Sequence, residues 1–407
     1  MLKKQSTRQL FLFLLILSLV LPAAAVRAQS RGFAAIVAPD YSKFPTITTL
    51  LDAFDDQGQF IAGLHPSDVT ILENGQQISP DGLDELQPPV SVVIAVNSSP
   101  ILGTRDSLGV SRYDKMEAVI ENWAIARPAD SHDDISLTWN GGIVASHLPP
   151  SDWKTHFQTF DPALRTSKSG LAALSYALDA TQSAQTIPGE KKVILLLSGH
   201  LDNASIAGLQ DLTTRASTSG VRVFVWLADS QDFLANPGAL ALQDLADATG
   251  GRSLTFTGQE TLPDPEEWFS PFRHIYQLTY NSHIHAGGAQ TLSVEVVAKG
   301  LALTSPSVSF QLDVQPPNPI LLSLPEQILR QNPEKPFDTE SFQPTRQVIS
   351  ALIEFPDGHP RALKRTTLFV DGQKAAENTG EPFDKFSWDL TGYTASGQHM
   401  LAVEAED

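Results

Sequence analysis

Neutral oxygen-bearing side chains follow a strongly apolar run near position 97, and they form the clearest candidate site in the sequence. Residues 90–96 are rich in Val and Ile, as is typical of a buried strand, and the run ends in Asn97, Ser98, Ser99 and Pro100. Amide and hydroxyl oxygens in such a turn can bind a hard cation or hydrogen-bond a ligand. In open α/β sheets, ligands bind at the carboxyl ends of the strands. We therefore treat Asn97 and Ser99 as candidate binding residues.

Two later stretches place small polar residues in comparable positions. Residues 193–197 form another apolar run, and Ser198, Gly199 and His200 follow it directly. Ser169 comes just before a helical pattern of Leu residues, in the stretch TSKSGLAAL. Ser169 could therefore be a binding residue like Asn97 and Ser99, or it could be the N-cap of the helix, because Ser is a common N-cap residue.

The elements around these stretches alternate between two patterns from residue 88 to about residue 273. Apolar runs of strand length, such as residues 221–227, alternate with segments whose apolar residues recur at helical spacing, such as Met116, Ile120 and Trp123. This alternation predicts an α/β domain over residues 88–273, with an open, mostly parallel sheet that helices cover on both faces.

The first loop, in its place after a buried strand, resembles the first metal-binding loop of von Willebrand factor A (vWA) domains. In that family a strand leads into Asp-x-Ser-x-Ser. Here Asn97 stands at the Asp position, Ser99 keeps the middle hydroxyl, and Ile101 replaces the last Ser. The resemblance covers roughly residues 88–280 and implies a vWA-like fold.

The other two loops resemble the remaining parts of the vWA cation site. The family supplies a Thr before a later helix, where this chain has Ser169, and an Asp-Gly after a central strand, where it has Gly199 and His200. No matching position carries a carboxylate, whereas Mg²⁺ is usually held by one or two carboxylates. We therefore expect a vWA-like domain that has lost metal binding and uses no cofactor. Asp106 and Asp202 lie near the loops and could supply charge, although a loop acid or a helix cap is the simpler role for each.

Strand patterns flank the α/β segment on both sides. Residues 29–87 contain Asn74-Gly75 between two short apolar runs, which predicts a tight hairpin, and residues 274–315 alternate apolar and polar side chains. We expect these two flanks to form one β-sandwich, with the α/β domain inserted in it or next to it. Residues 316–407 follow a Pro-rich joint, contain short alternating strands, and resemble bacterial Ig-like β-sandwich modules.

The N-terminus predicts export. Three basic residues precede the apolar run 10–21, and small residues then offer cleavage sites, so residues 1–28 read as a secretory signal peptide. The run is too short for a stable membrane span, and the chain has no cysteine. We expect a secreted or cell-surface protein with possible cell-envelope association. Either the C-terminal domain is complete at Asp407, or a last strand and a surface anchor follow.

Charge and motif content argue against several classes of function. The chain carries a net charge of −18 without a basic cluster, which disfavours nucleic acid and anionic lipid as partners. No phosphate-binding loop, dinucleotide fingerprint or nucleophile elbow occurs. Ser198, His200 and Asp202 are too close in one loop to form a catalytic triad, and His283 with His285 lacks a third zinc ligand.

These patterns favour a non-enzymatic exported protein that acts in protein recognition or surface assembly. The expected contact surface is the loop rim around residues 97–101, 167–169 and 199–203, and the partner is a protein whose identity the sequence does not give. A structural spacer of the cell envelope is one alternative. An extracellular hydrolase with an unrecognised site is another.

Overall fold

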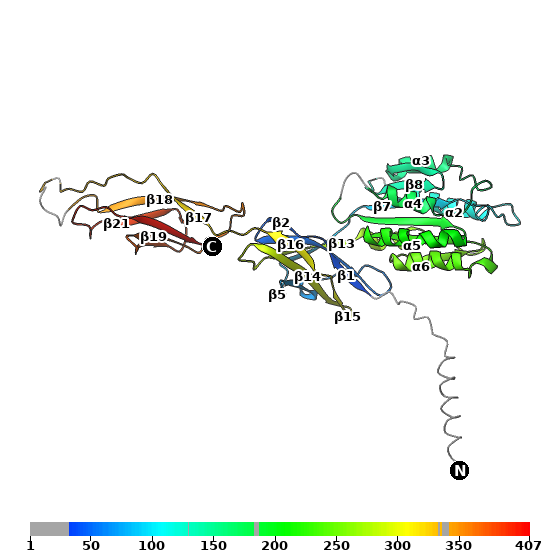
Figure 1. Ribbon diagram of the computed structural model, residues 1–407, viewed down its shortest axis with the longest axis horizontal. Helices are drawn as coiled ribbons and strands as arrows, with labels where there is room; N and C mark the ends of the chain where they lie inside the picture. Colours follow the sequence, from blue (N-terminus) through cyan, green and yellow to red (C-terminus); the bar gives the residue numbers. More distant parts are fainter. Residues whose placement is uncertain (1–31, 129, 183–186, 333, 336–341) are drawn as a thin grey trace, which may run out of the picture.

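The computed structural model describes residues 32–128, 130–182, 187–332, 334–335 and 342–407, which form an elongated molecule (Figure 1). The α/β part lies at one end, a group of antiparallel sheets lies in the middle, and the C-terminal strands lie at the other end. The predicted signal peptide, residues 1–28, falls outside the described residues. Within those residues, no helix has both the length and the apolar character that a membrane span needs.

Six strands of the described chain form the sheet of the α/β part, in the order β12-β11-β10-β7-β8-β9. All neighbours are parallel except β8 and β9. This confirms the predicted mostly parallel sheet. The strands are β7 (Val90–Asn97), β8 (Asp134–Trp139), β9 (Gly142–Leu148), β10 (Lys191–Ser198), β11 (Val221–Ala228) and β12 (Ser253–Phe256).

Helices cover both faces of this sheet and produce two hydrophobic cores. Val92, Ile94 and Val96 of β7 point into a core with α2, α3 and α7, whereas Val93 and Ala95 point into a core with α4, α5 and α6. Because both faces of β7 are buried, its sequence is continuously apolar. The helices are α2 (Arg112–Ile125), α3 (Pro150–Thr159), α4 (Ala172–Ala180), α5 (Asn203–Thr218), α6 (Pro237–Ala248) and α7 (Glu266–Phe269), with short 3₁₀ turns η2 (Gln231–Phe233) and η3 (Ser270–Arg273).

Strands from before and after the α/β part pair with one another in two antiparallel sheets. One has the order β1-β3-β13-β6 with β2 on β3, and the other has the order β15-β14-β4-β5 with β16 on β14. Both sheets contribute side chains to one core. The bounds are β1 (Phe33–Ile36), β2 (Asp40–Lys43), β3 (Thr46–Phe54), η1 (Pro66–Asp68), β4 (Val69–Glu73), β5 (Gln76–Ile78), β6 (Gly82–Leu86), β13 (Ile275–Asn281), β14 (Gly288–Ala298), β15 (Leu301–Thr304) and β16 (Val308–Leu312).

The predicted hairpin lies between β4 and β5. Asn74 and Gly75 join these strands with φ angles of 51° and 80°, the positive values that a tight two-residue turn requires.

The C-terminal strands form two three-stranded antiparallel sheets, β17-β18-β21 and β20-β19-β22. Ile349, Ala351, Leu368, Phe386 and Trp388 belong to the core that both sheets share. The bounds are β17 (Asn318–Leu322), β18 (Arg346–Glu354), β19 (Arg365–Val370), β20 (Gln373–Asn378), β21 (Lys385–Asp389) and β22 (Leu401–Glu406).

The amino ends of the parallel strands face the antiparallel sheets. Lys191, at the start of β10, forms an ion pair with Asp52 of β3. Arg222, near the start of β11, lies 5.0 Å from the ring centroid of Phe33 and 5.1 Å from that of Phe54. The carboxyl ends of β7, β10 and β11 therefore point away from these sheets, toward the end of the molecule that the α/β part forms (Figure 1).

Candidate binding site at the carboxyl edge of the sheet

Asn97 is the centre of a hydrogen-bond network that joins three loops. Its side-chain amide donates to the hydroxyl of Ser198 at 2.8 Å and to that of Ser169 at 3.5 Å. Its Oδ1 accepts the backbone N–H of Gly170 at 3.0 Å. Asn97 is 1% exposed and Ser198 is fully buried, so the bond between these two residues is shielded from water, whereas Ser169 and Gly170 are partly exposed. The structure thus brings the predicted residues Asn97 and Ser169 together through uncharged groups.

Ser169 does not act as the N-cap of the following helix. The N-cap of α4 is Leu171, which offers no side-chain hydrogen bond. The contact of Ser169 is instead the long-range one with Asn97. The alternative N-cap interpretation of this residue is therefore wrong.

Asn140 is a member of the same edge that the sequence interpretation missed. It follows β8 directly, and its Oδ1 accepts the N–H of Ser98 at 2.7 Å while its amide donates to the carbonyls of Ser98 at 3.0 Å and Lys168 at 2.7 Å. Its position directly after an apolar strand was the available signal. Next to this contact, the hydroxyl of Ser99 is buried and has no hydrogen-bond partner among the described residues.

Ile101 packs directly on Gly199. A Cβ atom placed on Gly199 would lie 3.0–3.2 Å from three carbons of the Ile101 side chain, closer than an ordinary van der Waals contact. An apolar contact therefore occupies the place where the resemblance to vWA loops puts an Asp and a Ser.

A double-mutant cycle tests this contact. We expect Gly199→Ala to lower the free energy of unfolding by about 1 kcal/mol, because the new methyl group overpacks against Ile101. In an Ile101→Ala background the same change is expected to cost close to nothing. Urea unfolding of the four proteins measures both effects, and strictly additive values would show that the two residues do not touch.

His200 is fixed by Asp229, a second residue that the sequence interpretation missed. Asp229 follows β11, is 2% exposed, and its Oδ2 lies 2.6 Å from Nδ1 of His200 while accepting the His200 backbone N–H at 3.1 Å. The imidazole also stacks on Phe233, with 5.0 Å between the ring centroids. The Asp229 carboxylate is thus already bonded to His200, which lies in the loop after β10.

Arg112, the first residue of α2, links the outer loops through hydrogen bonds. Its guanidinium donates to the carbonyls of Ile101 at 3.2 Å and Thr257 at 3.0 Å, and to the hydroxyl of Ser230 at 3.3 Å. Burial lowers the pKa of Arg112, and the nearby charges of Asp229 and Glu260 oppose that shift. These bonds hold the loops after β7, β11 and β12 in a fixed relation.

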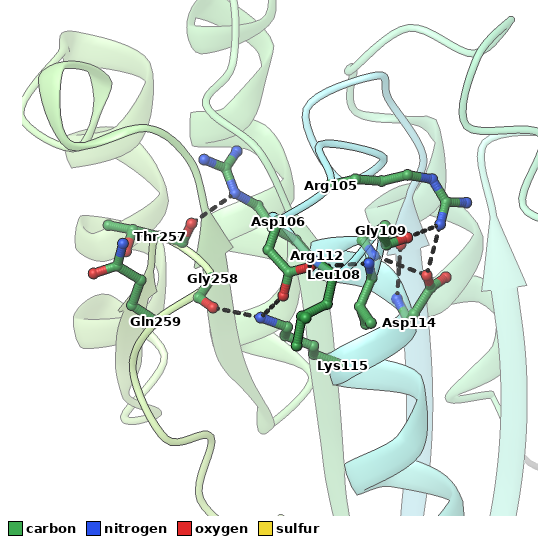
Figure 2. A network of polar contacts seen from close by, with 12 residues as sticks. Arg105, Asp106, Leu108, Gly109, Arg112, Asp114, Lys115, Thr257, Gly258 and Gln259 are labelled. Atoms are coloured by element: carbon green, nitrogen blue, oxygen red, sulfur yellow. Dashed lines mark hydrogen bonds and ion pairs between the residues drawn. The ribbon is translucent and has the colours of Figure 1, made fainter.

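Asp106 belongs to a loop brace and not to the Asn97 network (Figure 2). It accepts the backbone N–H groups of Leu108 at 2.9 Å and Val110 at 3.0 Å, and it pairs with Lys115 at 2.7 Å. The hydrogen bond from Lys115 is the main cause of the lowered pKa of the Asp106 carboxyl. Lys115 in turn donates to the carbonyl of Gly258 at 2.7 Å, so the brace reaches the loop after β12.

Asp202 is the N-cap of α5. Its Oδ1 accepts the backbone N–H of Ser205 at 2.8 Å, and this bonding lowers the pKa of the carboxyl. Because Asp202 caps a helix and His200 pairs with Asp229, the contacts of a Ser198–His200–Asp202 relay are not formed. Within the described ranges, no group of three or more His, Cys, Asp or Glu side chains is arranged to hold a metal ion.

An open pocket of about 370 Å³ lies over this edge. Two of its walls come from the loop before α4, which contributes Arg165 and Lys168, and from the loop after β7. The lining residues are Ser99, Pro100, Ile101, Arg165, Thr166, Ser167, Lys168, Ser169, His200 and Asp202. The pocket therefore gathers four of the six predicted site residues, whereas Asn97 and Gly199 are not among its lining residues.

No protein-family model matches this sequence, and no curated protein matches it. Solved structures do. The chain is similar to the SpRpn10 VWA domain, with 12% identity, a TM-score of 0.32, and coverage of 42% of this chain and 90% of that one. It is also similar to the TFIIH p34 N-terminal domain, with 13% identity, a TM-score of 0.30, and coverage of 46% of this chain and 97% of that one.

Proposed function

We propose that this chain is an exported, non-enzymatic protein that recognises another protein through the loop rim of its α/β part, without a bound cation. The observation that carries the proposal is the position of the rim. The loops after β7 and β10 and the loop before α4 are hydrogen-bonded to one another at the edge of the sheet that faces away from the rest of the chain (Figure 1). A fixed and exposed set of loops on a rigid sheet is a common form of recognition surface.

The donor set supports a cation-free site. The matched loop positions offer Asn97, Ser99 and Ser169, and the amide oxygen of Asn97 is already bonded to Gly170. A divalent cation in this uncharged setting would lose its hydration shell without a carboxylate to replace it. The residues present therefore do not fit Mg²⁺.

A thermal melt tests this part of the proposal. We expect the melting temperature of the chain to be the same with Mg²⁺ and with EDTA, because binding to the folded state alone would raise it. Asp106 and Asp202 are two nearby carboxylates that could supply charge by moving, and Asp229, buried beside His200 at the same edge, is a third. An increase with Mg²⁺ that EDTA reverses would contradict the cation-free site.

The charge of the pocket wall indicates the chemistry of the partner. Arg165 and Lys168 are exposed on the wall of the pocket and outnumber Asp202, the one carboxylate among its lining residues, in a chain whose net charge is −18. Local positive charge in an acidic protein steers and orients partners with acidic side chains. We therefore propose a protein partner that presents an acidic surface to this rim.

Charge-reversal variants test whether the partner binds this surface or another part of the molecule. The variant Arg165→Glu with Lys168→Glu is expected to lose a partner that is crosslinked to the wild-type chain on intact cells. Arg365→Glu with Lys374→Glu, on exposed positions of β19 and β20, makes the same change in net charge far from the rim and is expected to keep that partner. Equal recovery with both variants would overturn the proposal.

A structural spacer is the second candidate function. The α/β part, the middle antiparallel sheets and the C-terminal strands follow one another along an elongated molecule (Figure 1). Arg361 joins the middle and C-terminal parts, since its guanidinium donates to the carbonyl of Gln315 at 2.5 Å and lies 5.8 Å from the ring centroid of Phe44. A fixed joint of this kind would suit a stalk. Failure to crosslink any protein to the wild-type chain on intact cells would favour the spacer.

A further inference from the structure

His200 places an imidazole ring in the wall of the pocket over the carboxyl edge, which we call the rim pocket. Arg165, Lys168 and His200 line this pocket, and the side chain of His200 is 25% exposed. Asp229 is 2% exposed and is not among the lining residues. The ring therefore reaches the pocket on one side and a buried carboxylate on the other.

Two contacts fix the orientation of this ring. Nδ1 of His200 lies 2.6 Å from Oδ2 of Asp229. One face of the ring stacks on Phe233, with 7° between the two planes. Among the described residues, Nε2 of His200 has no hydrogen-bond partner. The ring is thus held at one edge and one face, and Nε2 is left for a group that enters the pocket.

The Asp229 carboxylate determines which ring nitrogen carries a proton. Its Oδ2 also accepts the backbone N–H of His200 at 3.1 Å, and its Oδ1 accepts that of Ser230 at 2.7 Å. The charge of Arg112 attracts that of Asp229. N–H donors and a nearby cation favour an ionised carboxylate, which only accepts hydrogen bonds. Nδ1 therefore carries a proton in every state of the ring, and Nε2 is an acceptor in the neutral ring and a donor in the charged ring.

We propose that Asp229 is a positioning residue of the rim and that the charged ring of His200 donates its Nε2–H to a carboxylate of the partner. The inference rests on the proposed function, from which it takes the acidic partner. A neutral ring presents only a lone pair to that carboxylate, which is a repulsive contact. The partner therefore binds the charged ring more tightly, and recognition strengthens as the pH falls.

The other charged groups around His200 are of kinds that keep their charge near neutral pH. Asp, Lys and Arg side chains ordinarily titrate outside the range of about pH 5.5–8, whereas histidine titrates within it. The elements around the ring contribute Arg112 in α2, Arg165 and Lys168 before α4, Asp202 after β10, Asp229 after β11 and Asp232 in η2. A change of binding over this range is therefore expected to follow the charge of His200.

The imidazole nitrogen signals test the positioning role without a ligand. At pH 8, the full chain with ¹⁵N-labelled histidine is expected to show His200 protonated on Nδ1. Asp229→Asn can donate an amide N–H to Nδ1, so we expect the proton to move to Nε2. The His200 signal is the one that His200→Gln lacks. An Nε2-protonated wild type, or the same tautomer in Asp229→Asn, would overturn the positioning role.

Titration with acetate at constant ionic strength tests the contact itself, because acetate supplies a carboxylate without the rest of a partner. The dissociation constant of acetate, followed through NMR signals of the pocket residues, is expected to be about tenfold lower at pH 6 than at pH 8. The amide of His200→Gln donates at both pH values, so this variant is expected to bind acetate equally at both. Circular dichroism melts check that His200→Gln and Asp229→Asn are folded.

The outcomes separate this inference from the proposed function. Wild-type binding that is equal at pH 6 and pH 8, yet abolished by Arg165→Glu with Lys168→Glu, would overturn the role of His200 and leave the acidic-partner site intact. A pH dependence that persists in His200→Gln would belong to another group and would also overturn the inference. Absence of acetate binding at both pH values would contradict the acidic partner itself.

Discussion

Replacement of Asn97 by Ala is expected to lower the free energy of unfolding of the α/β part by about 1–3 kcal/mol, the usual cost of leaving a buried polar group unsatisfied. The variant removes the acceptor of the Gly170 N–H and the donor to Ser198. It also separates the loop before α4 from the loop after β7. Urea unfolding followed by tryptophan fluorescence measures the loss.

Asn203→Ala is the matched control, because Asn203 is exposed in the first turn of α5. Its effect is expected to lie within about 0.5 kcal/mol, as for most surface substitutions. If Asn97→Ala were as mild as Asn203→Ala, the Asn97 network would not hold the three loops together.

The second large effect is expected at the opposite edge of the same sheet. Arg273 forms ion pairs with Asp133 at 2.5 Å and with Glu266 at 2.6 Å, and Asp133 is 4% exposed. Arg273→Met leaves the Asp133 carboxylate buried without its partner. We expect a loss of about 3–5 kcal/mol at pH 7, the range measured when one partner of a buried pair is removed.

The pH dependence of this loss has a definite sign. Burial raises the pKa of Asp133, but its bonds with Arg273 outweigh burial, so the folded-state pKa lies below the ordinary value. The wild-type contribution is therefore present above about pH 4 and is lost as the pH falls through the folded-state pKa. Without Arg273, burial dominates and protonation relieves the buried charge.

The deficit of Arg273→Met is accordingly expected to be smaller at pH 4 than at pH 7. Urea unfolding at the two pH values measures it. Arg215→Met, which breaks the exposed pair with Asp179, serves as the control and is expected to cost less than about 1 kcal/mol at either pH. A deficit that is equal at both pH values would contradict the buried-charge explanation.

The sequence predicted those parts of the structure that depend on local pattern. The apolar run of β7 predicted a strand buried on both faces, because a continuous run of apolar side chains is visible in the sequence itself. Asn74-Gly75 predicted the hairpin between β4 and β5 for a similar reason, since few residues tolerate the φ angles of that turn. The helix-cap role of Asp202 also follows from its place just before a helical pattern.

The missed residues depend on the order of strands, which the sequence does not show. Asn140 and Asp229 each follow a strand, but only the placement of β8 and β11 on either side of β7 and β10 brings them to the site. Likewise, Ile101 could be recognised as a replacement for a hydroxyl residue. Its packing on Gly199 is a tertiary contact between two loops.

The most direct test of a cation-free recognition rim uses the partner protein that crosslinking on intact cells has identified. It measures how much of that partner, without crosslinker, the immobilised chain retains in Mg²⁺ and in EDTA. The Asn97→Ala/His200→Ala variant serves as the comparison. We predict equal retention by the wild type in both buffers and loss of retention by the variant in both. Retention by the wild type that requires Mg²⁺, or equal retention by the variant, would contradict the account.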